Sequence, residues 1–137
     1  MKILMAVNQL PSAEVGGVGL FSAHLAGALS LAGHELLLLG GTEQESGGAS
    51  RLEPVEPAAP GVRTMRLVRG ARPRGLGVLG GIINPAVDAL LEQAIREHAP
   101  DLVHIQHTLQ LSARLTSIGI QAGAAVVASV HDYWPIC

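Results

Sequence analysis

The chain has 137 residues, of which 48% are apolar and 15% are charged, and its formal net charge is −2. This size and composition indicate one compact domain and exclude a disordered tail or a strongly basic nucleic-acid-coating protein, so no nucleic-acid partner is expected. The longest apolar stretch, residues 25–41, is broken by polar residues and predicts no membrane span, and the N-terminus has no secretory signal core, so we expect a cytoplasmic protein.

The first half of the chain alternates strand-like and helix-like runs. Residues 2–7 form an apolar run of strand length that ends at polar residues and a proline. Residues 18–31 have apolar positions at helical spacing, and Gly33 is placed to stop that helix. Residues 35–39 and 62–68 are predicted as the next two strands, the former closed by a pair of glycines.

Two segments between these elements are predicted to lack regular structure. Residues 42–61 are rich in Glu, Gly, Ser and Pro, and residues 69–81 are rich in glycine and basic. Long stretches of this composition are typical of functional or mobile loops. We therefore expect the lowest order of the chain in these two segments.

The second half continues the alternation. Asn84-Pro85 is a helix start, because proline suits a first turn where its missing N–H has no intrahelical partner. Strands are predicted at residues 102–105 and 125–130, with a helix near 109–122 between them. Alternating strands and helices favour a doubly wound parallel sheet with helices on both faces, because each crossover must return over the sheet.

In such a sheet, ligands bind outside the carboxyl ends of the strands. Three polar or glycine-rich segments converge there: residues 8–19, 106–110 and 131–137. The first contains four consecutive candidate substrate-binding residues, Gly16, Gly17, Val18 and Gly19.

This glycine loop lies between the first strand and the first helix, where backbone N–H groups can hold phosphate. It does not spell the dinucleotide fingerprint, because Ser22 stands where the third glycine or alanine belongs. A nicotinamide-dependent oxidoreductase or an epimerase is therefore disfavoured. A tight turn that only allows helix packing stays open as an alternative.

Three histidines lie near the same edge. His104 lies inside a strand and is interpreted as a hydrogen-bonded structural residue, whereas His107 lies at the strand exit and is a candidate sugar contact. Their side chains should point to different environments, so they predict no shared metal site. His131 directly follows the last strand, where its imidazole could donate a hydrogen bond to a sugar hydroxyl or a leaving phosphate. For Trp134 we favour packing at a domain boundary over sugar stacking.

A basic cluster follows the acidic segment in the middle of the chain; it consists of Arg63, Arg66, Arg69, Arg72 and Arg74. Two interpretations stay open. The cluster is either a solvated strand and loop or a surface that contacts an anionic acceptor or the face of a membrane.

Several motifs together resemble a known family, the family 4 retaining glycosyltransferases of the GT-B fold. They are Met1-Lys2-Ile3-Leu4, Gly16-Gly17-Val18-Gly19, Pro100-Asp101-Leu102-Val103-His104 and the run VVASVHDYWP over residues 126–135. The match spans nearly the whole chain in order and spacing. Its most specific part is the terminal HDYWPIC.

The resemblance implies two Rossmann-like domains that face a cleft. Residues 1–137 would form the N-terminal, acceptor-side domain, and a C-terminal domain absent from this chain would hold most of the nucleoside-diphosphate sugar. Gly17 and the backbone after it match the family's glycine loop, and His131 matches the histidine that points at the donor sugar.

The family usually needs no metal or other cofactor. It retains the anomeric configuration by a front-face attack in which the leaving phosphate helps to deprotonate the acceptor. This half therefore needs no nucleophilic carboxylate, and none is assigned to Asp132. The leading hypothesis is sugar transfer from a nucleoside-diphosphate sugar to an unknown acceptor, with the isolated chain inactive. A stand-alone ligand-binding α/β module without catalysis is the alternative.

Overall fold

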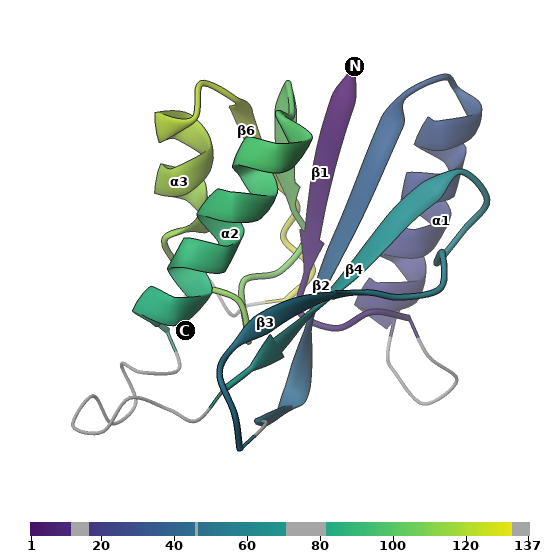
Figure 1. Cartoon of the computed structure of the whole chain (residues 1–137). Helices are drawn as coiled ribbons and strands as arrows, with labels where there is room; N and C mark the ends of the chain where they lie inside the picture. Colours follow the sequence, from purple (N-terminus) through teal and green to yellow (C-terminus); the bar gives the residue numbers. More distant parts are fainter. Residues whose placement is uncertain (12–16, 46, 71–81, 133–137) are drawn as a thin grey trace.

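The computed structural model describes residues 1–11, 17–45, 47–70 and 82–132 (Figure 1). Strands and helices alternate along most of this length. In chain order the elements are β1 (Lys2–Val7), α1 (Gly17–Leu31), β2 (Glu35–Glu45), β3 (Arg51–Pro54), β4 (Val62–Arg69), α2 (Pro85–His98), β5 (Leu102–Ile105), α3 (Leu115–Gln121) and β6 (Ala125–Ala128).

Within the described residues, the strands form one sheet in the order β3-β4-β2-β1-β5-β6. All neighbouring strands run parallel except β3 and β4, which are antiparallel. The predicted Rossmann-like α/β class with a parallel sheet is confirmed, and the antiparallel edge strand β3 is an addition that the sequence did not predict. β1 pairs with β2 on one side and with β5 on the other, so it lies inside the sheet.

The helices cover both faces of the sheet, as predicted: α1 lies on one face, and α2 and α3 lie on the other (Figure 1). Alternate residues of β1 point to the two layers. Ile3, Met5 and Val7 pack in the cluster on the α1 side, whereas Leu4 and Ala6 pack in the cluster under α2 and α3. A strand that is buried on both faces has a continuous run of apolar residues. The predicted strand over residues 2–7 is confirmed with the same bounds.

The expected lack of structure in residues 42–61 is wrong. β2 does not stop at Gly40 and Gly41 but continues to Glu45, and β3 pairs with β4 inside the same segment. The glycines permit a close approach: a Cβ on Gly41 would lie 2.9 Å from the carbonyl oxygen of Asn8. Gly40 and Gly41 allow tight packing against the loop after β1. The prediction that they end the strand is therefore wrong.

Helix α2 begins as predicted. The Asn84 side chain accepts hydrogen bonds from the N–H groups of Ala86 and Val87, and Pro85 occupies the first turn. Such a cap satisfies N–H groups that have no partner within the helix. At the other end, Ala99 adopts a left-handed conformation and its N–H donates to Ile95 O. The predicted helix and its N-terminal signal are thus confirmed.

The last two elements are shorter than predicted. The helix expected near residues 109–122 is limited to α3. Gln110 has a positive φ of 67°, which interrupts a right-handed helix at that residue. The strand expected over 125–130 ends as β6 at Ala128, although Ser129 N–H still donates to Ile105 O. Residues 71–81, most of the second segment expected to be poorly ordered, lie outside the described residues.

Candidate functional site

The carboxyl ends of β5 and β6 open into a cavity of about 480 Å³. Its walls are the residues that follow these two strands, together with Ile82 before α2 and with Ala113 and Thr116 at the start of α3. Apolar side chains make up much of the wall, and histidine, glutamine and hydroxyl side chains provide polar groups. This is the edge at which an open α/β sheet binds ligands.

His131 lies at this edge, three positions beyond the end of β6. Its Nε2 lies 2.6 Å from Oε1 of Gln106, and its ring contacts Phe21 of α1 edge-on, with ring centroids 5.2 Å apart. The contact with Phe21 brings His131 next to the first turns of α1. The structure therefore brings together two of the predicted features, the final histidine and the helix that follows the glycine loop.

Gln106 lies at the centre of a hydrogen-bonded row of polar side chains, formed by Ser129, His104, Gln106 and His131. Its side-chain Nε2 lies 3.0 Å from Nε2 of His104, and the same ring nitrogen lies 2.9 Å from the hydroxyl of Ser129. Gln106 is only 1% exposed, and its backbone N–H donates to the carbonyl of Ala6 in β1. The sequence placed Gln106 at the strand exit but assigned it no role.

His104 has the structural character predicted for it, because its ring is hydrogen-bonded within this row. Burial is the main cause that lowers its pKa, and the nearby His131 lowers it further. A lowered pKa favours the neutral imidazole. His104 thus supplies a neutral ring nitrogen beneath the site.

His107 lies at the exit of β5 and lines the cavity, as expected. Its Nδ1 accepts a hydrogen bond from the N–H of Leu109, so Nε2 carries the proton and donates to Asp132 Oδ2 at 3.2 Å. This bond joins the exits of β5 and β6. His107 and His104 have different partners, in agreement with their predicted separate environments, and the role of His107 in sugar binding stays a prediction.

The glycine loop is described from Gly17 onward, and Gly16 lies outside the described residues. Gly17 is the first residue of α1, and a Cβ there would meet nothing within 4 Å. Val18 is half-buried, whereas Gly19 is buried and a Cβ on it would lie 3.0 Å from Gln9 O. Gly19 therefore serves helix packing, while the space at Gly17 leaves the backbone accessible to a ligand. The packing interpretation thus holds at Gly19, and ligand binding at Gly17 stays a prediction.

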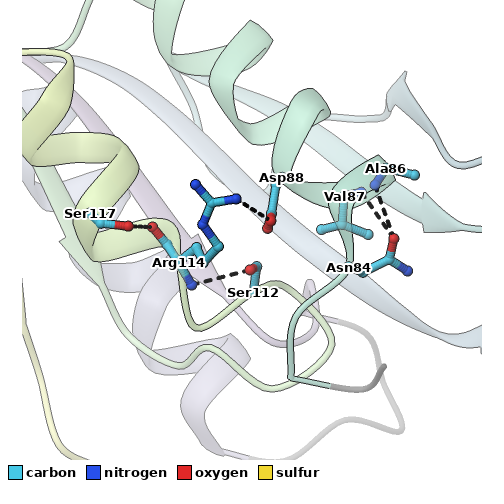
Figure 2. Close-up of polar contacts among 7 residues, drawn as sticks. All are labelled: Asn84, Ala86, Val87, Asp88, Ser112, Arg114 and Ser117. Atoms are coloured by element: carbon cyan, nitrogen blue, oxygen red, sulfur yellow. Dashed lines mark hydrogen bonds and ion pairs between the residues drawn. The ribbon is translucent and has the colours of Figure 1, made fainter. Parts of the chain in front are cut away.

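A polar contact joins α2 to the segment that leads into α3 (Figure 2). Arg114 Nη1 donates to the buried carboxylate of Asp88 at 3.1 Å, and Arg114 N–H donates to the Ser112 hydroxyl. Ala113 N–H also donates to Ile82 O, which joins the segment before α2 to the segment before α3. These bonds hold together the segments that carry Ile82 and Ala113 of the cavity wall.

The basic cluster does not share one face in the described residues. Arg63 and Arg66 are exposed on β4, three positions apart, so they point to opposite sides of the sheet. Arg69 is buried. Arg72, Arg74 and Trp134 lie outside the described residues, and the predicted contact with a membrane or an anionic acceptor stays a prediction.

Among the described residues, no group of three or more His, Cys, Asp or Glu side chains is arranged to hold a metal ion. None of the described helices combines the length and apolar character that crossing a membrane requires.

Comparisons with known proteins agree with the resemblance found in the sequence. The family described as Glycosyltransferase Family 4 matches residues 15–136. A solved structure similar to this chain is a sucrose-phosphate synthase from Thermosynechococcus elongatus, with a TM-score of 0.59 and 17% sequence identity. The match covers 96% of this chain and 33% of the synthase, so the chain spans about a third of that protein. The search of curated proteins returned no match.

Proposed function

The chain belongs to glycosyltransferase family 4, and we propose that it forms the acceptor-side half of an enzyme that transfers a sugar from a nucleoside-diphosphate sugar to an acceptor. The observation that carries this proposal is the contact between His131 and Phe21. It joins the segment after β6 to the helix that follows the glycine loop, beside a cavity large enough for part of an acceptor.

Each part of the site has a role in this reaction. The first turn of α1 presents N–H groups that have no partner within the helix, and Gly17 leaves space for a donor phosphate beside them. The cavity beyond β5 and β6 receives the acceptor, with its polar groups oriented toward hydroxyls and its apolar wall against the carbon skeleton. His131 lies at the border of these two regions and contacts the reacting sugar.

We propose that the reaction retains the anomeric configuration. In a front-face mechanism, the bond from the anomeric carbon to the leaving phosphate breaks while the acceptor oxygen bonds to the same face. The acceptor proton passes to the departing phosphate. This route needs no carboxylate nucleophile, in keeping with the engagement of Asp132 by His107.

A second α/β domain completes the proposed enzyme and holds most of the donor. The match to the synthase involves about a third of that protein, which leaves room for such a domain in an enzyme of similar size. The isolated chain is therefore expected to be inactive. We further propose that the enzyme works in the cytoplasm, as the sequence predicts.

The proposal is tested by supplying the full-length protein with a panel of nucleoside-diphosphate sugars and hydroxylated acceptors. Release of nucleoside diphosphate that depends on the acceptor, with a product of unchanged anomeric configuration by NMR, is the expected result. An inverted product would overturn the retaining mechanism. Ligand binding without any turnover across the panel would favour the non-catalytic module instead.

A further inference from the structure

We infer that Gln106 is a positioning residue for His131, and that its amide decides which ring nitrogen of His131 faces the substrate. The inference rests on the proposed function where it concerns substrate, but the arrangement of the amide and the two imidazoles stands on the structure alone. Gln106 touches His131 and His104, and acts on the reaction through His131.

Gln106 is well suited to hold another side chain. It is 1% exposed, and its backbone follows β5 directly and is bonded to β1 through the Ala6 carbonyl. His131, by contrast, is exposed and follows β6 at the surface. A buried amide on a fixed backbone therefore sets the direction of an exposed imidazole, and the edge contact with Phe21 limits its rotation.

The amide also imposes a chemical constraint. A glutamine side chain has an oxygen that only accepts hydrogen bonds and an NH₂ group that donates them. Its Oε1 faces Nε2 of His131 at 2.6 Å, so that nitrogen carries a proton and donates. Its NH₂ faces Nε2 of His104 at 3.0 Å, so that nitrogen carries a lone pair and accepts.

His104 meets this requirement. The hydroxyl of Ser129, 2.9 Å from the same nitrogen, can also donate to it. Burial lowers the pKa of His104 and so favours the neutral ring, the form in which Nε2 can carry a lone pair. With the lone pair on Nε2, the amide is held with its nitrogen toward His104 and its oxygen toward His131.

The consequence concerns the other nitrogen of His131. In the neutral imidazole, a proton on Nε2 leaves the lone pair on Nδ1. His131 then accepts a hydrogen bond from a sugar or acceptor hydroxyl at Nδ1. This differs from the sequence-based expectation that its imidazole donates to a hydroxyl or a phosphate.

The tautomer can be measured without any substrate. The ¹⁵N chemical shifts of histidine ring nitrogens distinguish Nε2–H from Nδ1–H, and the His131 signals are assigned by their loss in His131→Ala. The full-length wild type is expected to show His131 as the Nε2–H tautomer. Gln106→Met, which keeps the length but removes both polar ends, should give a mixture of tautomers. Gln106→Asn, which is too short to reach, should do the same and serves if the first variant fails to fold.

A matched control is Gln93→Met, because Gln93 is exposed on α2 and bonds to Glu97 away from the site. It should leave the tautomer and the turnover unchanged. An Nδ1–H tautomer in the wild type, or an unchanged tautomer in both Gln106 variants, would overturn the inference.

Kinetics separate positioning from structural support. With an active donor and acceptor pair, Gln106→Met should lower kcat about 3- to 10-fold, the range expected for loss of one hydrogen bond that orients a reacting group. In a His131→Ala background the same change should have no further effect, because its target is gone. A full additional loss in that background would refute positioning through His131. If no transfer is found while the tautomer still follows Gln106, the proposed function fails and the positioning stands.

Discussion

His131 combines an exposed ring with a fixed orientation, and its side chain lies outside both apolar clusters. We therefore predict that His131→Ala lowers kcat of the full-length enzyme by about 10²-fold, the low end for a positioned polar group in the transition state. The melting temperature should fall by only a few degrees, because the bond to Gln106 and the edge contact with Phe21 are lost but no contact within the apolar clusters is. Turnover at saturating donor and thermal unfolding are measured on the same preparations.

The matched control for this variant is His24→Ala, because His24 is exposed on α1 and lies in a different turn from Gly17. It should retain wild-type turnover. If His131→Ala keeps turnover within about threefold, less than ~1 kcal/mol of barrier, the role of His131 in the reaction is refuted.

Two histidines, the buried His98 and the half-buried His104, make stability depend on pH. Burial is the main cause that lowers the pKa of both His98 and His104 below the ordinary value of about 6.5. Between the lowered and ordinary values, the unfolded chain binds more protons than the folded chain. The stabilisation is therefore complete above about pH 6.5 and is lost as the pH falls through the folded pKa values.

Urea unfolding followed from about pH 8 to about pH 5 checks this direction. The free energy of unfolding should fall as the solution becomes more acidic, and His98→Gln should flatten the dependence. His98 Nε2–H donates to the buried Ile3 carbonyl, and a glutamine amide can replace that donor without titrating. The exposed His24→Gln is the control and should leave the slope as it is. A free energy that rises on acidification would contradict the assignment.

At the site, the sequence could predict where single residues lie but not which side chains bond to each other. His131 could be placed at the ligand edge because it follows a predicted strand of the sheet, and its role there stays a prediction. The role of Gln106 could not be predicted, because it depends on His131, 25 residues further along the chain, and on the protonation of His104. The residue types next to Gln106 in the sequence do not show that its side chain bonds to these two histidines.

At the scale of elements, the contact between Asp88 and Arg114 joins α2 to the start of α3 (Figure 2). Asp88 is buried, whereas Arg114 is about half-exposed. Arg114→Met leaves a buried carboxylate without its partner and should lower the free energy of unfolding by about 1–3 kcal/mol. Urea denaturation measures the change.

The control is Arg96→Met, because Arg96 is exposed in the last turn of α2. Its stability should stay close to that of the wild type. Asp88→Asn in the Arg114→Met background should recover part of the loss, since the buried charge is then removed. Equal stability of Arg114→Met and Arg96→Met would show that the contact does not hold the two helices together.

Element prediction succeeded where a single segment carries its own signal, as in the cap at Asn84 or the apolar run of β1. It failed at Gly41, where the missing side chain makes room for the loop after β1. The sequence alone does not distinguish such a glycine from one that ends a strand. β3 was missed for another reason. Its four residues are exposed or half-buried at the sheet edge, so they lack the apolar pattern of an inner strand.

For the whole molecule, the proposed division between two domains predicts weak binding by residues 1–137 alone. In that proposal, this half contributes a phosphate contact at the first turn of α1, and the second domain supplies most donor contacts. Isothermal titration calorimetry with a nucleoside diphosphate should detect no micromolar binding, whereas the full-length protein should bind. Micromolar affinity of the isolated chain would overturn the division.

The position of β1 within the sheet has a consequence for synthesis on the ribosome. β1 emerges before the other strands of this sheet, and β2 and β4 can join one side of it early. Its other edge pairs with β5, which emerges only after α2. Until then, an apolar strand presents unpaired backbone groups that can associate with other chains. Nascent chains that stall before Leu102 should therefore need a chaperone to prevent association through the unpaired edge of β1. The hydrogen-bonded side chains of Ser129, His104, Gln106 and His131 can come together only after β5 has paired with β1.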